Sequence, residues 1–165
     1  FDKNKSQYIV QRTAGLRNKK YQYVENCPPM KWKLMDGDST IAGYKCNKAE
    51  TELFGRTYIA WYSPDIVMPY GPYKFNGLPG LVLRVTDTRG HFDFLLNGLE
   101  KVHGYKPIYL WAKADIVKTN RETVRKIYKN YCADPVSALT SSGVTIPDDV
   151  KATVSAKPYN PMEME

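Results

Sequence analysis

The sequence has few of the residues on which metal and nucleophile chemistry depends. It contains two histidines, His91 and His103, and three cysteines, Cys27, Cys46 and Cys132. Neither histidine belongs to an HExxH motif or an obvious metal pair, and the cysteines lack the spacing of zinc ligands. The chain also lacks a GxSxG motif and a Gly-rich phosphate loop. We therefore expect no metal, no cofactor and no catalytic residue that the sequence alone identifies.

Long apolar runs are missing too. No segment approaches the ~20 consecutive apolar residues that a membrane helix needs, so we expect no insertion into a membrane. The sequence shows no signal peptide and begins at Phe1 without a methionine. We expect a mature or trimmed fragment, which leaves an exported origin open.

The composition that remains is that of one globular domain. Of 165 residues, 42% are hydrophobic and 25% are charged, which is enough to bury a core without a metal or many disulfides. The net charge of +7 favours anionic neighbours. The basic residues are scattered, however, and their two clusters, at 17–20 and 121–129, carry no RNA-binding or zinc-finger signature. We expect a solvated basic surface and no nucleic-acid partner.

Short segments rich in β-branched and aromatic residues recur along the chain, each closed by turn residues. This spacing predicts hairpins and an antiparallel sheet. The expected strands are 6–11, 20–25, 30–35, 40–49, 56–62, 81–87 and 91–97.

In two of these strands apolar and polar residues alternate, which predicts the face of the sheet toward which each side chain points. In 30–35, Met30, Trp32 and Leu34 are expected to point one way and the lysines between them the other. In 91–97, Phe92, Phe94 and Leu96 are expected to share a face. The polar sequences DGDS at 36–39 and DTRG at 87–90 predict tight turns between strands.

A single good helix is expected over 120–132. Thr119 and Glu122 have the spacing of a capping box, and apolar side chains from Val124 to Tyr131 form one stripe. Pro135 is expected to end the helix. We therefore expect one β-rich domain over 1–134, followed by an extended segment over 135–165.

The cysteines allow two interpretations. If the 36–39 turn pairs 30–35 with 40–49, Cys46 lies opposite Pro29 and within a short step of Cys27, which favours a bond between these two cysteines. Cys132 would then be buried and free against the helix. The alternative is three reduced, buried thiols, as expected in a reducing compartment.

The segment 69–80 concentrates proline and glycine around aromatic rings. Half of its twelve residues are Pro or Gly, and Tyr70, Tyr73 and Phe75 lie between them. Prolines fix the backbone and glycines let chains approach closely, so this loop is stiff. Its rings could form a platform for a ligand, or they could fold inward as a plug for an open sheet.

At this loop the sequence resembles a known family. KWKLMDGDSTIAGYKCNKAE, GRTYIAWYSPDI, GPYKFNGLPGLVLRVTD and the terminal PYNPMEME together resemble the GLPGLI family of the Bacteroidota, with Val82 in place of the last Ile. The pattern is also similar to the bowl-like N-terminal domain of some bacterial peptide:N-glycanases, and more distantly to lipoprotein-carrier half-barrels.

The resemblance implies an exported protein, periplasmic or secreted, whose biochemical role is generally unassigned. It implies an open, curved antiparallel sheet, a half-barrel or bowl, with one α-helix near its mouth. It makes an oxidised cysteine pair more plausible. It supplies no catalytic residues.

Three hypotheses about function follow. The first is a non-catalytic envelope protein that binds an apolar, glycan or peptide ligand in a concave sheet, with Trp61, Tyr70, Tyr73, Phe75 and Leu78 as ligand contacts or cavity lining. The second is a protein interaction module of the cell envelope. The third is a small hydrolase with a carboxylate pair drawn from Asp65, Asp87, Asp93, Glu100 and Asp115. An open apolar hollow of roughly 300 Å³ or more would favour the first.

Overall fold

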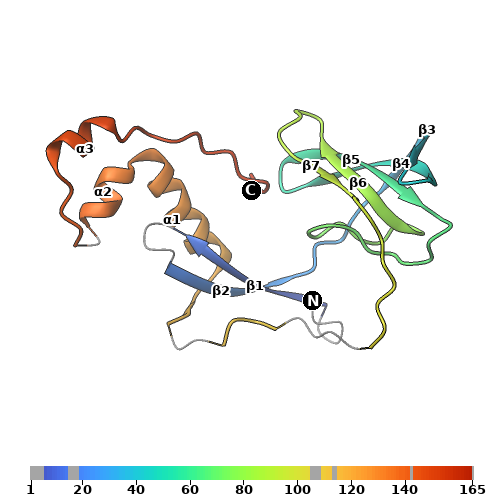
Figure 1. Ribbon diagram of the computed structural model, residues 1–165, viewed down its shortest axis with the longest axis horizontal. Helices are drawn as coiled ribbons and strands as arrows, with labels where there is room; N and C mark the ends of the chain where they lie inside the picture. The colour runs from blue at the N-terminus through green and yellow to red at the C-terminus, as the bar shows by residue number, and fades with distance from the viewer. Residues whose placement is uncertain (1–5, 15–18, 105–108, 113–114, 142, 165) are drawn as a thin grey trace. The chain divides into compact units, whose positions relative to one another are not determined.

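The computed structural model describes residues 6–14, 19–104, 109–112, 115–141 and 143–164. These divide into two compact units (Figure 1). Unit 1 comprises Phe1–Cys27 and Lys106–Asn160, and unit 2 comprises Pro28–Tyr105 and Pro161–Glu165. Each unit is therefore assembled from two separate stretches of the chain.

Unit 2 is built on one antiparallel sheet of five strands in the order β3-β4-β5-β6-β7. The strands are β3 (Lys33–Ile41), β4 (Tyr44–Leu53), β5 (Arg56–Ser63), β6 (Leu81–Asp87) and β7 (Asp93–Leu95). Neighbours in the sheet are neighbours in the chain, so the sheet is a meander (Figure 1).

Two tight turns set the register of this meander. Ala42 and Gly43 join β3 to β4, and Phe54 and Gly55 join β4 to β5, with φ of 50°, 84°, 48° and 76° respectively. Positive φ at both central residues is the type I′ geometry, whose twist matches that of the flanking strands. The expected turn at 36–39 is wrong, because these residues lie inside β3, where the pairing register shifts between Met35 and Asp38.

The observed strand register places Cys46 opposite a different residue from the one that the sequence predicts. Cys46 pairs with Ser39 and not with Pro29, because the hairpin reverses at Ala42 and Gly43. All three cysteines are free in the structure. Cys46 is fully buried, and Cys27 belongs to the other unit, where its thiol donates to the Tyr8 hydroxyl. The Cys27–Cys46 disulfide expected from the sequence is absent.

The core of unit 2 lies on one face of the sheet. Along β5 the buried positions alternate, at Arg56, Tyr58, Ala60 and Tyr62, as expected of a strand with one covered face. The cluster comprises Ala49, Leu53, Tyr58, Ala60, Tyr62, Phe75, Leu78, Val82 and Val85, with Met30, Trp32, Phe54, Phe94 and Met162 packed against it.

Only part of the predicted face pattern of 30–35 is found. Met30 and Trp32 pack against the core, but they precede β3. Leu34 lies within β3 and is 65% exposed, so its expected inward direction is wrong. In 91–97, Phe92, Phe94 and Leu96 are the less exposed residues, as expected.

Unit 1 joins a small sheet to one main helix. β1 (Gln7–Ala14) and β2 (Lys19–Asn26) form an antiparallel pair, and β8 (Val117–Lys118) lies parallel to β2. The helix α1 (Arg121–Ala133) packs through Val124 on Ala14, Tyr21 and Tyr23.

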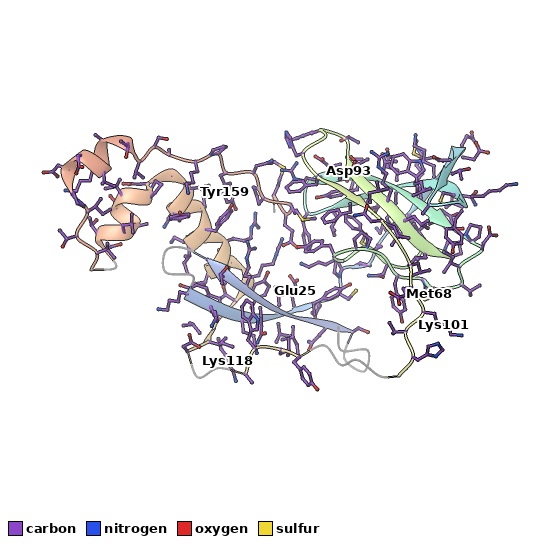
Figure 2. All side chains as sticks on the ribbon, viewed as in Figure 1. Glu25, Met68, Asp93, Lys101, Lys118 and Tyr159 are labelled. Atoms are coloured by element: carbon purple, nitrogen blue, oxygen red, sulfur yellow. The ribbon has the colours of Figure 1, made fainter. Side chains whose placement is uncertain are left out.

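The helix start differs by one residue from the expected one. Asn120 is the N-cap, and its side chain accepts from Thr123 N at 2.8 Å, so the capping box of Thr119 and Glu122 is wrong. Figure 2 labels Tyr159, whose ring lies 5.8 Å from that of Tyr128 on α1.

Two further short helices lie in the stretch that was expected to be extended. Asp134 ends α1 and caps α2 (Pro135–Thr140), whose first residue is the proline expected to stop α1. α3 (Asp148–Thr153) has no buried residue. The sequence pattern missed both because neither helix has an apolar stripe long enough to give a period.

The expected fold class, mainly β with antiparallel strands, is confirmed. It is realised as two sheets with three short helices, and no closed barrel is formed by the residues that the structure describes. The domain boundaries at 1–134 and 135–165 stay a prediction. Within the described ranges, no helix is both long and apolar enough to cross a membrane.

Candidate functional site

The loop between β5 and β6, residues 64–80, contains the proline- and glycine-rich segment 69–80. It is held by its own backbone hydrogen bonds, from Phe75 N to Pro72 O at 3.1 Å and from Gly77 N to Pro69 O at 3.2 Å. Val82 N donates to Tyr70 O at 2.9 Å, which ties the loop to β6. The proline- and glycine-rich sequence therefore gives an ordered loop, because its turns satisfy its own polar groups.

Two glycines allow this loop to lie close to the sheet. A Cβ on Gly71 would come within 2.8 Å of Val82 Cβ and 2.9 Å of Phe75 O. A Cβ on Gly80 would overlap the carbonyl oxygen of Ser63. At both positions any side chain would push the backbone apart, so these glycines are needed for close approach.

The loop divides its apolar side chains between core and surface. Phe75 and Leu78 are 1% and 2% exposed, and the Phe75 ring meets Tyr58 edge-on at 4.8 Å. Tyr70 and Tyr73 are each 46% exposed. Phe75 and Leu78 therefore fill the core as a plug, whereas the two tyrosines present surface that a ligand could reach.

Trp61, the fifth residue expected at the site, lies half-buried on β5. The Arg84 guanidinium lies 5.3 Å from the centre of its ring. Arg84 in turn holds Asp93, which is labelled in Figure 2, through two hydrogen bonds of 2.9 and 2.8 Å. Trp61 is thus covered in part by an ion pair that joins β6 to β7.

An open apolar groove of about 320 Å³ lies beside the loop. One wall is formed by residues 70–72 of the loop, and the others are formed by β6 and by residues 94–96 at the edge of the sheet. Its lining residues are Tyr70, Gly71, Pro72, Leu81, Val82, Leu83, Phe94, Leu95 and Leu96. Leu95 is 52% exposed on its rim. The volume lies within the range of small-ligand pockets.

Of the five predicted site residues, Tyr70 alone lines this groove. The other four residues were predicted because they are aromatic or belong to the GLPG motif. Neither property indicates which face of the loop borders the groove. Leu81, Leu83 and Leu95 were missed. No local sequence signal identifies them, because the groove forms only where three separate stretches of the chain come together.

Two of the five candidate carboxylates, Asp87 and Asp93, form ion pairs with arginines. Asp87 is buried and accepts from Arg56 Nη1 at 3.1 Å and from His91 N and Phe92 N at 2.7 and 2.8 Å. Burial alone would raise the pKa of Asp87, but these two amide groups and the guanidinium together lower it. The hydrogen bond from Arg84 lowers the pKa of Asp93.

Unit 2 also contains a buried ion pair that the sequence did not indicate. Glu163 forms a buried ion pair with Lys74 and accepts a hydrogen bond from the Tyr73 hydroxyl. Tyr73 has a φ of 55°, a left-handed conformation that costs a non-glycine residue about 1 kcal/mol. No sequence signal connects residues 73 and 163, because only the fold brings them together.

Metal-ligating side chains do not gather anywhere in the described parts of the chain: no three His, Cys, Asp or Glu residues there could hold an ion together. His91 lies near Arg56, whose Nη1 is 3.2 Å from His91 Nδ1. Asp87 Oδ2 also lies 3.8 Å from His91 Nδ1, so the imidazole is close to both a guanidinium and a carboxylate.

Comparison with protein families gives a match over residues 52–84 to a model described as a protein of unknown function, Porph_ging. The matched stretch runs from the end of β4 through the loop into β6. It contains one motif of the resemblance to the GLPGLI family in full, at 55–66, and most of a second, at 71–87. A search of curated proteins gives no match. The match supports a family of unknown function, and it does not name GLPGLI.

Two solved structures of PNGF-II are similar to this chain. The one in space group C2 has a TM-score of 0.55 at 21% identity and covers 78% of this chain. The one in space group P21 has a TM-score of 0.50 at 21% identity and covers 68%. This chain spans 24% and 21% of those chains. Similarity at this identity establishes a shared fold.

Proposed function

We propose that the protein is a non-catalytic, exported envelope protein that binds an apolar ligand in the groove beside the 64–80 loop. The observation that carries this proposal is the groove itself: an open volume of about 320 Å³ bordered by leucines of two strands and by a loop that forms its own backbone hydrogen bonds. A preformed apolar hollow loses little conformational entropy when a ligand enters it.

The lining favours an aliphatic or aromatic ligand over a glycan. Leu81, Leu83 and Leu95 offer no hydrogen bond, and Tyr70 contributes the one side-chain hydroxyl among the lining residues. A sugar brings many hydroxyls that would lose water without new partners. A lipid chain or the apolar side chains of a peptide lose no such hydrogen bonds, and burying their surface contributes about 25 cal/mol per Å².

The hydrolase alternative receives less support from the carboxylates. A general acid at neutral pH needs a raised pKa, whereas the pKa values of Asp87 and Asp93 are both lowered by their partners. Both side chains are also held in fixed positions by arginines. Their roles are better explained as links between β5, β6 and β7.

The proposal is tested with an apolar fluorescent probe, anilinonaphthalene sulfonate, titrated into the folded protein. Leu95→Glu places a negative charge on the rim of the groove. We expect it to weaken saturable binding about tenfold or more, since it removes apolar contact and repels the sulfonate of the probe. Leu34→Glu is the matched control, because Leu34 is 65% exposed on β3 at the opposite edge of the sheet.

Equal loss of binding in both variants, or no saturable binding by the wild type, would contradict the proposal. A series of fatty acids of increasing chain length, used as competitors, then distinguishes a lipid-like site from a smaller one. Affinity is expected to rise by about 0.8 kcal/mol per buried CH₂ until the groove is filled.

A protein interaction role is the second candidate, and exposed apolar side chains in the loop favour it, notably Val67 and Met68. Light scattering over a range of concentrations tests self-association through this surface. Export to the periplasm or beyond is part of the proposal and is supported by the family resemblance. Fractionation of the source cells, followed by detection of the native protein, tests it.

A further inference from the structure

Residues 161–164, here called the closing segment, lie in a slot of unit 2 formed by side chains and backbone of residues 54–74. The side chains that form hydrogen bonds with the closing segment include those of Arg56, Tyr58, Tyr73 and Lys74. Each of these lies 89 to 105 residues before its partner in the sequence. The stretch immediately before the segment, up to Asn160, belongs to unit 1. The segment therefore enters unit 2 as a separate peptide would.

The backbone of the closing segment is bound by three hydrogen bonds. Arg56 Nε donates to Pro161 O at 2.9 Å, and the Tyr58 hydroxyl donates to Met162 O at 2.8 Å. Met164 N donates to Phe54 O at 2.8 Å. Binding of main-chain groups by fixed protein groups gives affinity for an extended peptide.

Two side chains of the segment give the slot its specificity. Met162 packs against the core of unit 2, and the carboxylate of Glu163 forms the buried ion pair with Lys74. The Lys74 ammonium lies 5.0 Å from the centre of the Phe54 ring and 5.1 Å from that of Tyr73. A cation close to two rings, with a tyrosine hydroxyl beside it, offers two charge-assisted hydrogen bonds to a carboxylate.

We propose that this slot is an exchangeable peptide-binding site. Its resident occupant is the chain's own closing segment, and the closing segment of a second copy of this chain takes its place. Exchange of an identical element reproduces every contact described above and needs no new interface. The sequence recognised is an extended Pro-Met-Glu-Met, with the glutamate as its anchor.

The first experiment measures binding of a synthetic peptide covering residues 157–164, with neutral ends and a fluorophore. The receptor is the full chain carrying Glu163→Gln, which weakens the resident segment without changing its shape. We expect saturable binding to this variant and much weaker binding to the wild type, because a tethered segment competes at an effective concentration on the order of mM.

Two controls make the peptide result specific. A peptide with glutamine in place of Glu163 is expected to bind about tenfold or more weakly, since a charge-assisted hydrogen bond is lost. Lys74→Met combined with Glu163→Gln is expected to bind neither peptide while keeping a cooperative melting transition. If Glu163→Gln itself fails to fold, the titration is made on the wild type with peptide at about 10 mM, above that effective concentration.

The second experiment asks whether a second copy supplies the segment. Chains with ¹⁴N and ¹⁵N are mixed, incubated and treated with a zero-length carbodiimide, which joins Lys74 to Glu163 when they are in contact. We expect a crosslinked pair of peptides in which one is light and the other heavy. Pairs of equal isotope alone would overturn exchange between copies. Absence of peptide binding to the folded Glu163→Gln chain, or binding that survives Lys74→Met, would overturn the slot as a recognition site.

Discussion

Asp87 is the residue whose ionisation we expect to matter most for stability, because it ties three parts of unit 2 together. It neutralises Arg56, and Arg56 also holds the Pro161 carbonyl and lies 5.0 Å from the centre of the Phe92 ring. Asp87→Asn would leave the guanidinium buried without a counter-charge, so we expect a loss of about 3–5 kcal/mol in the free energy of unfolding. Urea denaturation followed by tryptophan fluorescence measures it.

The same carboxylate predicts how stability depends on pH. Because its folded pKa lies below the ordinary value of 3.8, its contribution is fully present above that value and is lost as pH falls through the lower folded pKa. We expect the unfolding free energy of the wild type to fall more steeply below pH 4 than that of Asp87→Asn. Asp93→Asn is the control, since its ion pair with Arg84 is exposed to solvent and contributes at most about 1 kcal/mol. Parallel curves for the wild type and Asp87→Asn would contradict the assignment.

The three thiols predict a simple pattern of chemical reactivity. Cys46 and Cys132 are buried, and burial raises the pKa of the Cys46 thiol, which disfavours the reactive thiolate. Cys27 is half-buried. We expect one fast-reacting thiol in the native protein and three in denaturant, measured with Ellman's reagent without reductant. A single thiol in denaturant would show instead that two cysteines are bonded.

The hairpins depend on glycine at their second turn position. At Gly43, with φ of 84°, a Cβ would meet no atom within 4 Å, so an alanine there would be strained by its backbone alone. We expect Gly43→Ala to destabilise the protein by about 1–2 kcal/mol. Gly98→Ala is the matched control, since it too has open space but no positive φ, and we expect it to be neutral. Equal melting temperatures for the two variants would argue against the type I′ turn.

The secondary structure of the central strands could be predicted from the sequence, and the register could not. β6 is found at the predicted 81–87 and β5 within one residue of 56–62, because alternation and turn residues are local signals. The turn between β3 and β4 was misplaced because DGDS has stronger turn chemistry than Ala42-Gly43. The sheet resolves this conflict by absorbing Gly37, with φ of 115°, into an irregular strand. The misplaced turn put Cys46 opposite Pro29 in the predicted hairpin, whereas Cys46 pairs with Ser39 in the structure.

Even less of the candidate site could be predicted, because both the groove and the Lys74–Glu163 pair depend on contacts between residues that are distant in sequence. The composition of the segment 69–80, rich in proline and glycine, drew attention to the loop that borders the groove. The groove, however, is formed only where residues 70–72 of the loop, residues 81–83 of β6 and residues 94–96 come together. The Lys74–Glu163 pair joins residues 89 positions apart. Composition and spacing report local preferences, and neither reports which side chains a fold brings together.

The helices and strands differ in how many buried residues they contain. This difference predicts which of them exchange their amide hydrogens first. β5 and β6 lie inside the five-stranded sheet and contribute most of its core, including Tyr58, Ala60 and Val85. α3 buries no residue and has six residues, too few for a helix to be stable without packing. We expect amide hydrogen exchange, followed by mass spectrometry, to be slowest for peptides from β5 and β6 and to approach the unfolded rate for 148–153. The helical hydrogen bonds of α3 would not delay exchange, because opening them exposes almost no apolar surface. Protection of α3 comparable to that of β5 would contradict this ranking and would mean that further contacts stabilise the helix.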